Sequence, residues 1–563
     1  MNTIMKNKTK NILILVVTMS VGLVVSSCDF LSEDLIDAAP GEYLSTPDGF
    51  QDGVNACYAH LRRIYGAEQP AAFMQTYGTD LWEYGFGGDF GALGAYDLNL
   101  NPRQSDITNV WNWVYEGINT CNAVITRGAE VNINEQLKNT RLAEARFVRA
   151  INYFFLVRQY GGVHLTLEET VGLETEATRA SVAEVYDAII GDLTFALNTL
   201  PVTNTDVGRA TRPAAEHMLA IVHLTRASHP EAGQPGDYGA AADFATSVIE
   251  DYGFALVPSW EELFDINNQE NEEVVWAIKN SSNPQTRGFQ GNRMNNWFLP
   301  RYETAPGVTR TIELGRAWSR FRPTQYMFFE LYDRDVDGRA EAMFQRTFLV
   351  NDPGPTRTAN GQDVNFVEGE IAMYFPLEPW TDAQIQAAGY SVFNPGQPGE
   401  GSDVRWTGTL YPREQLKHPD PTRPDPFDSW SQRDWNVARL AETHLIAAEA
   451  IMMSGGDLTV AAEHVNVVRR RAAAPGVDPA LMEITPGDLT IDFILEERGR
   501  ELNAEMHRWH DLVRTGKLLE RVTQFAPHQN RAANIRDFHV LRPIPQDQID
   551  RTSTPFPQNP GYN

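Results

Sequence analysis

Apolar residues recur at every third or fourth position through residues 433–474, a spacing that places them on one stripe of an α-helix. The run is interrupted once, at Ser454-Gly455-Gly456-Asp457. Glycine suits the left-handed end of a helix, and aspartate caps the start of the next one. The pattern therefore predicts two helices, over 434–454 and 458–474, that pack as a tetratricopeptide-type hairpin.

The same plan recurs along the chain. Residues 211–228 with 238–251 form a matching pair, and further pairs are 43–65 with 107–128 and 137–160 with 181–200. A hairpin of this kind cannot bury its apolar face alone, so the hairpins at 211–251 and 434–474 predict one stacked array that a long insertion interrupts. The alternative is a generic α-helical bundle that uses alanine for close packing.

Two stretches show neither helical nor strand periodicity. Residues 73–100 combine glycines with aromatic residues, and residues 255–430 are punctuated by Pro, Gly and Asp. Aromatic side chains in a glycine-rich loop either pack down as a lid or stand exposed to stack on something flat. We therefore divide the chain into a helical-repeat region at 43–254, a loop-rich insertion at 255–430 and a second helical region with a tail at 431–563.

The N-terminus has the organisation of an export signal. A basic segment, KNKTK at 6–10, precedes an apolar run at 12–25 that is too short to span a bilayer comfortably. The run ends in VSSC at 25–28, and small residues before a cysteine resemble a bacterial lipobox. This predicts a signal peptide over 1–27, lipidation of Cys28 and a tether over 28–42. Acidic residues after Cys28 resemble a surface-export signal of lipoproteins; the alternative is a plain secretory signal.

Several ordered motifs resemble those of one family. They are AEARFVRA at 143–150, YGGV at 160–163, RLAE at 439–442, RWHDLVRTG at 508–516 and NPGY at 559–562. Together they resemble the SusD/RagB-like outer-membrane nutrient-binding lipoproteins, and the resemblance runs from the lipobox to the last residues. His164 departs from the proline that usually follows the YGGV segment.

The resemblance implies a fold and a function. The fold is mostly α, with about four tetratricopeptide-like hairpins packed against a loop-rich irregular region. Such proteins lie on a TonB-dependent, SusC-like transporter in the outer membrane and hold an oligosaccharide for import. RagB-like members hold peptide instead, and a surface glycoside hydrolase is a further alternative. The implied location is the cell surface, with the lipid on Cys28 as the anchor.

Within this interpretation, the two aperiodic stretches supply candidate glycan contacts. Sugar rings pack their C–H faces on aromatic rings, and their hydroxyls need planar donors and acceptors. The predicted contacts are Trp82, Tyr84, Tyr96, Asn292, Arg293, Asn296, Trp297, Arg301, Trp318 and Arg320. For residues 291–298, the alternative is a buried loop joined to its neighbours by asparagine side chains.

Charge narrows the choice of partner. The chain has a formal net charge of −27, which argues against nucleic acid and anionic membrane as general partners. Residues 279–322 reverse this locally, with eight basic residues, seven of them arginine, against two acidic ones. These arginines either pair with Asp and Glu elsewhere in the chain or select an acidic oligosaccharide, since the guanidinium matches carboxylate and sulfate in pairs of hydrogen bonds.

No catalytic, metal or cofactor site is predicted. The acidic pairs Glu261/Glu262, Glu272/Glu273 and Glu496/Glu497 are sequence neighbours, whose side chains point apart rather than across a cleft. Glu496, Glu497, Arg498 and Arg500 are predicted to form ion pairs on a helix face. The sequence also lacks HExxH, GxSxG and P-loop motifs. Cys57 and Cys121 are compatible with a disulfide that their spacing does not establish.

Overall fold

The computed structural model describes residues 42–86, 91–172, 174–287, 291–394, 409–526 and 531–562. The predicted signal peptide, the lipidated Cys28 and most of the tether lie outside these residues. Within them, no helix combines the length and apolarity needed to cross a lipid bilayer.

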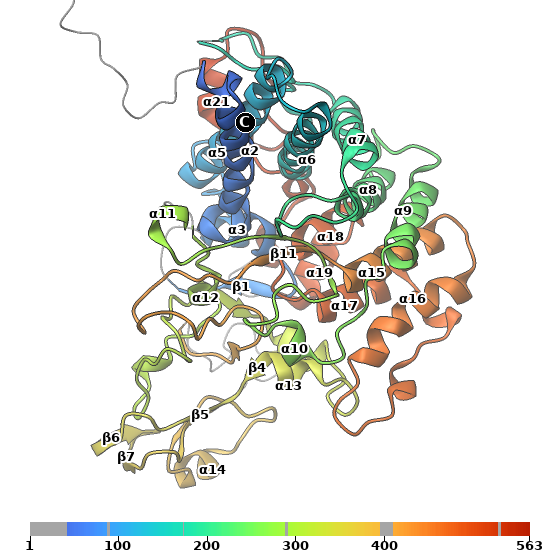
Figure 1. The fold of residues 1–563 in the computed structure, drawn as a ribbon. Coiled ribbons are helices and arrows are strands. Elements are labelled where there is room, and N and C mark those ends of the chain that lie inside the picture. The colour runs from blue at the N-terminus through green and yellow to red at the C-terminus, as the bar shows by residue number, and fades with distance from the viewer. Residues whose placement is uncertain are drawn as a thin grey trace, which may run out of the picture.

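Eight helices stack one against the next and form the upper and right-hand parts of the molecule in Figure 1. In packing order they are α2 (Pro47–Arg62), α5 (Ser105–Gly128), α6 (Glu135–Tyr160), α7 (Val182–Thr199), α8 (Arg212–Ala227), α9 (Asp237–Asp251), α15 (Leu440–Met453) and α16 (Leu458–Arg471). All four predicted hairpins are confirmed. The contact between α9 and α15 continues the array across the long insertion.

Local sequence explains where these helices begin. At the start of α2, the Thr46 side chain accepts a hydrogen bond from the Gly49 amide at 3.1 Å, and a proline occupies the first turn. At the start of α7, Ser181 and Glu184 form a reciprocal capping box. A buried apolar stripe along each helix then drives stacking, which is why periodicity alone located the array.

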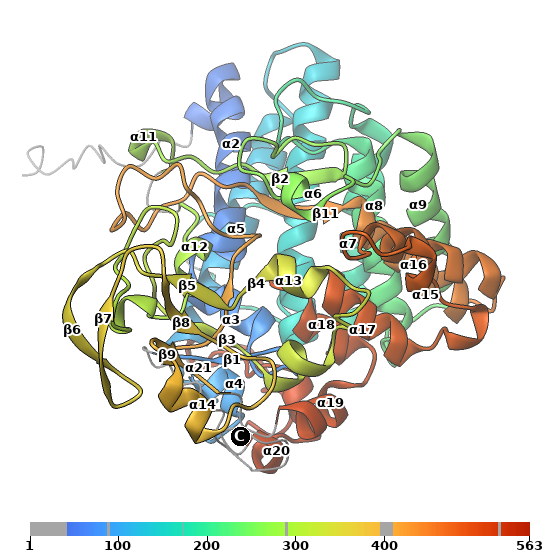
Figure 2. The ribbon, with the colours of Figure 1, turned by 90° about the horizontal axis from the view of Figure 1, so that it is seen from below.

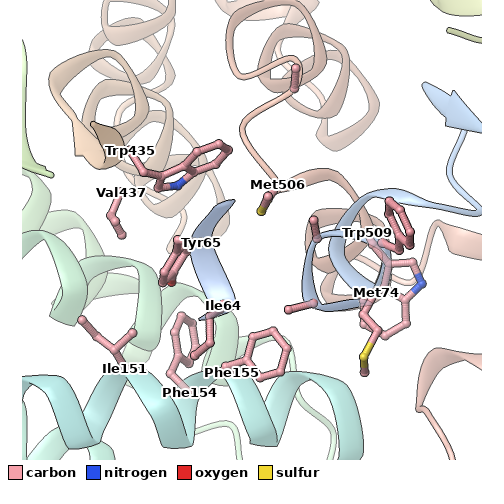
Figure 3. Close-up of a cluster of buried hydrophobic side chains, with 14 of the residues drawn as sticks. Ile64, Tyr65, Met74, Ile151, Phe154, Phe155, Trp435, Val437, Met506 and Trp509 are labelled. Atoms are coloured by element: carbon pink, nitrogen blue, oxygen red, sulfur yellow. The ribbon is translucent and has the colours of Figure 1, made fainter. Parts of the chain in front are cut away.

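The predicted start of the α15 helix is wrong. Residues Trp435–Arg439 form strand β11, which pairs antiparallel with β2 (Val274–Ile278). A short apolar run fits a buried strand as well as a helix, so periodicity could not separate the two. Figure 3 shows Trp435 and Val437 of this strand beside Tyr65 and the α6 residues Ile151 and Phe154. The two ends of the insertion are thus joined by a sheet against the helical array.

The insertion is loop-rich, as predicted, and occupies the lower left of Figure 1 and the left of Figure 2. Its helices are α10 (Trp260–Leu263), α11 (Pro284–Arg287), α12 (Met294–Trp297), α13 (Arg339–Met343) and α14 (Asp382–Ala387). Its further strands are β3 (Phe321–Pro323), β4 (Phe344–Gln345), β5 (Thr347–Leu349), β6 (Gly354–Ala359), β7 (Gln362–Phe366), β8 (Ile371–Tyr374), β9 (Ser391–Val392) and β10 (Arg413–Glu414). Within the insertion, β4 pairs with β10, β6 pairs with β7, and β5, β8 and β9 form a three-stranded sheet.

The aromatic segment 73–100 is more regular than predicted. It contains the end of α3 (Gln69–Thr76), the strand β1 (Trp82–Tyr84) and α4 (Gly91–Ala95). Strand β1 pairs antiparallel with β3, with Tyr84 opposite Phe321. The pairing joins segments more than two hundred residues apart, which no local pattern could indicate.

The C-terminal region adds α17 (Ile491–Glu501), α18 (Arg508–Arg514), α19 (Leu518–Phe525), α20 (Arg531–Asn534) and α21 (Gln546–Arg551). The predicted ion pairs exist on α17, where Arg500 contacts Glu496 at 3.1 Å and Glu497 at 3.0 Å. They are not confined to one helix face, because Arg498 turns away to Glu442 at 3.0 Å and Asp511 at 2.8 Å.

A buried ion network joins α17 to β2, β11 and α16. Arg439 contacts Glu273 at 2.8 Å, Glu501 at 2.7 Å and Glu505 at 2.8 Å. Arg471 of α16 reaches Glu273 at 2.9 Å and Glu501 at 2.5 Å. The network therefore lies where the insertion meets the helical array.

The two cysteines of the described region are buried free thiols in α2 and α5. Burial, together with the neighbouring Cys121, raises the pKa of the Cys57 thiol well above its usual value. The disulfide that the sequence left open is not formed in this structure.

Candidate ligand-binding face

Three of the predicted aromatic contacts lie in the core. Trp82 and Trp297 are 1% and 0% exposed, and Tyr96 is 2% exposed. The Trp82 indole donates a hydrogen bond to Asn503 Oδ1 at 2.9 Å, and the Tyr96 hydroxyl donates to the Gly78 carbonyl at 2.7 Å. The Trp297 ring packs near Phe73 and Phe321. Their faces are covered by other side chains, so the prediction that they contact a ligand is not retained.

Two of the predicted polar contacts are also internal. The Asn292 amide donates to the Arg433 carbonyl at 2.8 Å, and the Asn296 amide donates to the Ser429 carbonyl at 2.7 Å. Both side chains are almost fully buried. The loop at 291–298 is therefore the asparagine-joined loop that the sequence offered as its alternative, and it fixes α12 to residues 429–433.

The other five predicted residues, Tyr84, Arg293, Arg301, Trp318 and Arg320, are partly exposed. The backbone of 318–320 runs along the end of α12: the Trp318 amide donates to the Asn296 carbonyl at 2.9 Å and the Arg320 amide to the Trp297 carbonyl at 2.8 Å. Ser319 between them is buried and has a φ of 53°, a left-handed conformation that serine adopts rarely. These contacts fix the backbone of the segment, and the side chains of Trp318 and Arg320 on either side of Ser319 are partly exposed.

Arg320 links residues 318–320 to the aromatic segment 73–100. Its Nη1 donates to the Phe86 carbonyl at 2.7 Å and its Nε to Gln69 Oε1 at 2.8 Å. The backbones approach so closely that a Cβ on Gly85 would lie 2.3 Å from the Ser319 carbonyl oxygen. Phe86 itself is 46% exposed, and the Arg301 guanidinium lies 5.6 Å from the centre of its ring.

A second aromatic ring, Trp430, lies next to this group. The Arg287 and Arg293 guanidinium carbons lie 4.4 and 4.0 Å from the centre of the Trp430 ring. Arg316 connects the two parts, since it lies 5.8 Å from the Trp318 ring centre and donates to Ser429 Oγ at 2.7 Å. We call the whole surface the arginine–aromatic face; its members are Phe86, Arg287, Arg293, Arg301, Arg316, Trp318, Arg320 and Trp430.

Phe86 and Trp430 were not among the predicted site residues. Both belong to aperiodic stretches, in which every aromatic residue gives the same local signal whether it is exposed or buried. The useful signal was the density of arginine, because five of the eight basic residues between 279 and 322 fall on the face.

The charge-rich segment divides into two groups. Lys279 pairs with Glu270 at 2.9 Å and Asp434 at 2.5 Å, Arg310 with Glu303 at 2.5 Å, and Arg322 with Glu83 at 2.6 Å. These three follow the internal-pairing alternative. By contrast, within the described residues no Asp or Glu lies in ion-pair contact with Arg287, Arg293, Arg301 or Arg316. Burial and the neighbouring Arg287 lower the pKa of Arg293, although Glu68 opposes this.

The acidic neighbours in sequence do not converge on this face. Glu273 is buried in the ion network while Glu272 is exposed, so their side chains point apart as predicted. Glu497 is buried against Arg339 at 2.7 Å and Arg469 at 2.8 Å. Across the described ranges, no group of three or more His, Cys, Asp or Glu side chains is arranged to hold a metal ion.

Comparison with known proteins gives consistent matches. A sequence profile of the SusD family matches residues 272–562, and a second profile, described as starch-binding associating with outer membrane, matches residues 87–224. The SusD-like protein P2 of Formosa agariphila is 25% identical over 555 residues, covering 96% of this chain and 98% of that protein. The starch-binding protein SusD of Bacteroides thetaiotaomicron is 24% identical over 436 residues, covering 75% of this chain and 72% of that protein.

Among solved structures, a laminarin-binding SusD-like protein superposes with a TM-score of 0.64 at 23% identity. The alignment covers 92% of this chain and 100% of that protein. At this identity the likeness shows a shared fold. The order of helices and the loop-rich insertion are therefore features of a known architecture rather than of this chain alone.

Proposed function

The chain belongs to the SusD family, and from this premise we propose that it is a glycan-binding protein that captures oligosaccharides through the arginine–aromatic face. The observation that carries the proposal is the pairing of partly exposed rings with arginine donors on one held surface. Trp318 and Phe86 offer ring faces for the C–H groups of a sugar, and Arg301 and Arg320 lie beside them.

The fixed positions of the contacting side chains favour a role in binding. Ligand ordering costs less when the contacting side chains are already fixed, because little rotamer freedom is then lost on binding. Arg320 is fixed by Gln69 and the Phe86 carbonyl, and Arg316 by Ser429. A face built in this way is suited to binding rather than turnover, and we propose a non-catalytic protein.

The remaining elements of the role follow family membership. We propose that the protein acts with a SusC-like TonB-dependent transporter and delivers the glycan to it. We also propose that it is held at the outer-membrane surface by lipid on Cys28, the cysteine of the VSSC segment. Peptide capture of the RagB-like kind is the second candidate. The partly exposed ring faces of Trp318 and Phe86 favour glycan over peptide.

Replacing Trp318 by alanine is expected to weaken oligosaccharide binding. Loss of one stacked ring removes on the order of 1 kcal/mol, which corresponds to about a five- to tenfold rise in Kd. Isothermal titration calorimetry with a panel of oligosaccharides measures this directly. A peptide panel and product analysis in the same experiment test the two alternatives.

The matched control is Trp113→Ala. Trp113 is also partly exposed and also lies near an arginine, with Arg63 at 5.8 Å, but it belongs to α5 of the helical array. This variant should bind as the parent protein does. Equal loss in both variants, or no loss in either, would contradict the assignment of the face; release of shortened products would contradict the non-catalytic role.

Replacing Cys28 by alanine is expected to remove the protein from the outer membrane. The acyl chains are the proposed anchor in that membrane. In cells that lack the partner transporter, the outer-membrane fraction should then lack the variant, and the signal peptide should stay uncut at this position. Retention of the variant in outer membranes of such cells would contradict the anchor.

A further inference from the structure

We infer that the glycan bound by this face is anionic, and that its carboxylate or sulfate groups are held by Arg287 and Arg293 beside Trp430 and by Arg301 beside Phe86. The inference rests on the proposed function and adds the class of ligand. It follows from four arginines that the fold brings to one surface without acidic partners in the described residues, while other basic residues of the same segment are paired.

The strongest part of the argument is the pair on Trp430. Two guanidinium groups lie within 4.4 Å of the centre of one indole ring. In the described residues neither group forms a hydrogen bond or an ion pair, and the Nε atoms of both are buried without a partner. The terminal nitrogens of both groups therefore have no acceptor among the described residues and are available to an added one.

The backbone is shaped to bring these groups together. A Cβ on Gly291 would lie 2.6 Å from the Arg287 side chain and 2.8 Å from the Trp430 ring, so only glycine allows this approach without a shift. The Arg293 amide donates to the Gly66 carbonyl at 2.8 Å, and the next turn is α12. Backbone contacts thus position Arg293, and the absence of a side chain at Gly291 leaves room for Arg287 beside Trp430.

The positive charge of Arg287 acts unfavourably on Arg293. Glu68 acts in the opposite direction but lies beyond ion-pair contact with Arg293. An anion beside the two guanidinium groups would offset the repulsion between them and accept hydrogen bonds from their unused donors. The planar guanidinium binds carboxylate and sulfate through two parallel hydrogen bonds, which a neutral hydroxyl cannot match in charge.

Arg301 repeats the arrangement at Phe86. Its backbone amide donates to the Thr409 carbonyl at 2.7 Å, and in the described region its guanidinium forms no hydrogen bond or ion pair and lies 5.6 Å from the centre of the Phe86 ring. A sugar stacked on Phe86 would thus lie beside an arginine whose donors are unused. Two such arginine sites on one face fit an oligosaccharide that carries acidic groups on more than one of its sugar units.

The test compares ligands that share a sugar backbone and differ in the charge of its substituents. Oligogalacturonides and their neutral methyl esters form the uronate pair, and sulfated carrageenan oligosaccharides with their desulfated forms make the sulfate pair. Salt dependence alone is a poor measure, because the net charge of −27 repels an anionic ligand at long range while the face attracts it. At fixed ionic strength, the anionic member of at least one of these two pairs is expected to bind at least about tenfold more tightly than the neutral member of the same pair.

The double variant Arg287→Gln/Arg293→Gln removes the charges but keeps most of each side-chain stem. We expect it to reduce the preference for the anionic member to less than about threefold, and Arg301→Gln alone to reduce it in part. The matched control is Arg551→Gln, which makes a single charge change on the exposed surface of α21 and should leave the preference unchanged. Circular dichroism verifies that each variant is folded.

The outcomes separate the inference from the function on which it rests. Equal binding of neutral and anionic members, with loss in Trp318→Ala and none in the arginine variants, overturns the anionic ligand and leaves glycan capture intact. The anionic ligand is likewise overturned if only glycans outside both anionic sets bind. Absence of binding to every glycan tested overturns the proposed function itself.

Discussion

Replacing Arg439 by alanine is expected to lower the free energy of unfolding by about 3–5 kcal/mol, because it removes one of the positive charges that balance three buried carboxylates. Arg439 is 1% exposed and contacts Glu273, Glu501 and Glu505. Its positive charge and that of Lys417 lower the pKa of Glu505 to about 2. Without Arg439, Arg471 still contacts Glu273 and Glu501 and Lys417 still contacts Glu505. The buried network then has one more negative charge than before, and holding that charge in the core or neutralising it with a proton costs stability.

The matched control is Arg470→Ala. Arg470 also contacts two carboxylates, Glu463 and Glu483, but all three side chains are at least one-third exposed. Exposed pairs of this kind are worth about 0–1 kcal/mol because water and salt screen them. Urea denaturation followed by circular dichroism compares the two variants. A loss in Arg439→Ala no larger than that in Arg470→Ala would contradict the importance of the buried network.

The network gives a structural role to Arg439, the first residue of the RLAE motif. Arg439 is the last residue of β11 and precedes α15, Glu273 precedes β2, and Glu501 is the last residue of α17. One cation thus joins three elements that lie far apart in sequence, at the junction between the helical array and the insertion.

The helical array could be predicted from sequence because its information is local. The apolar stripe of α2, the cap at Thr46 and the glycines after α15 each act within a few residues. Strand β11 could not be predicted in the same way, because its identity depends on pairing with β2 across the whole insertion. The same holds for β1 and β3, which turn Trp82 into the core.

The site was predicted only in part for the same reason. Trp297 and Trp318 both lie in aperiodic sequence, yet one is covered by Phe73 and Phe321 and the other lies partly at the surface. The asparagines of the 291–298 loop bond to backbone from residues 429 and 433. Residue type indicated which chemistry was present, but long-range contacts decided which side chains remained available.

Lowering the pH from 7.5 to 5.5 is expected to reduce the free energy of unfolding, and three buried histidines contribute about 4 kcal/mol of this loss, at about 1.4 kcal/mol each. Burial lowers the pKa of His418 to about 4, of His444 to about 3 and of His539 to about 4. Positively charged neighbours add to the effect at His539, where Arg542 and Arg536 are close. At His444 the neighbour is His464, whose Nδ1 lies 3.0 Å away.

The direction of the change follows from proton uptake. In the unfolded chain these histidines take up protons below a pH of about 6.5, whereas in the folded protein they stay neutral until the pH nears 4. The unfolded state therefore binds more protons in this window, and stability falls as the pH falls. Below a pH of about 4.5 the carboxylates add to the loss, because their pKa values are also lowered in the folded state, as at Glu505.

Urea denaturation at constant ionic strength, at pH 8.5, 7.5 and 5.5, measures the effect. The value at pH 8.5 should be slightly higher than that at pH 7.5, because burial lowers the pKa of Lys417 to about 8 and the unfolded chain keeps that proton longer. The value at pH 5.5 should be the lowest. In His418→Phe the ring stack between Phe298 and Trp435 is kept while the titrating group is removed. This variant loses the hydrogen bond to the Ala504 carbonyl, so its absolute stability falls at every pH. Its difference between pH 7.5 and 5.5 should nevertheless be smaller than that of the parent by about 1.4 kcal/mol. An unchanged difference would show that His418 takes up its proton equally in both states, which its position between two aromatic rings in the core does not allow.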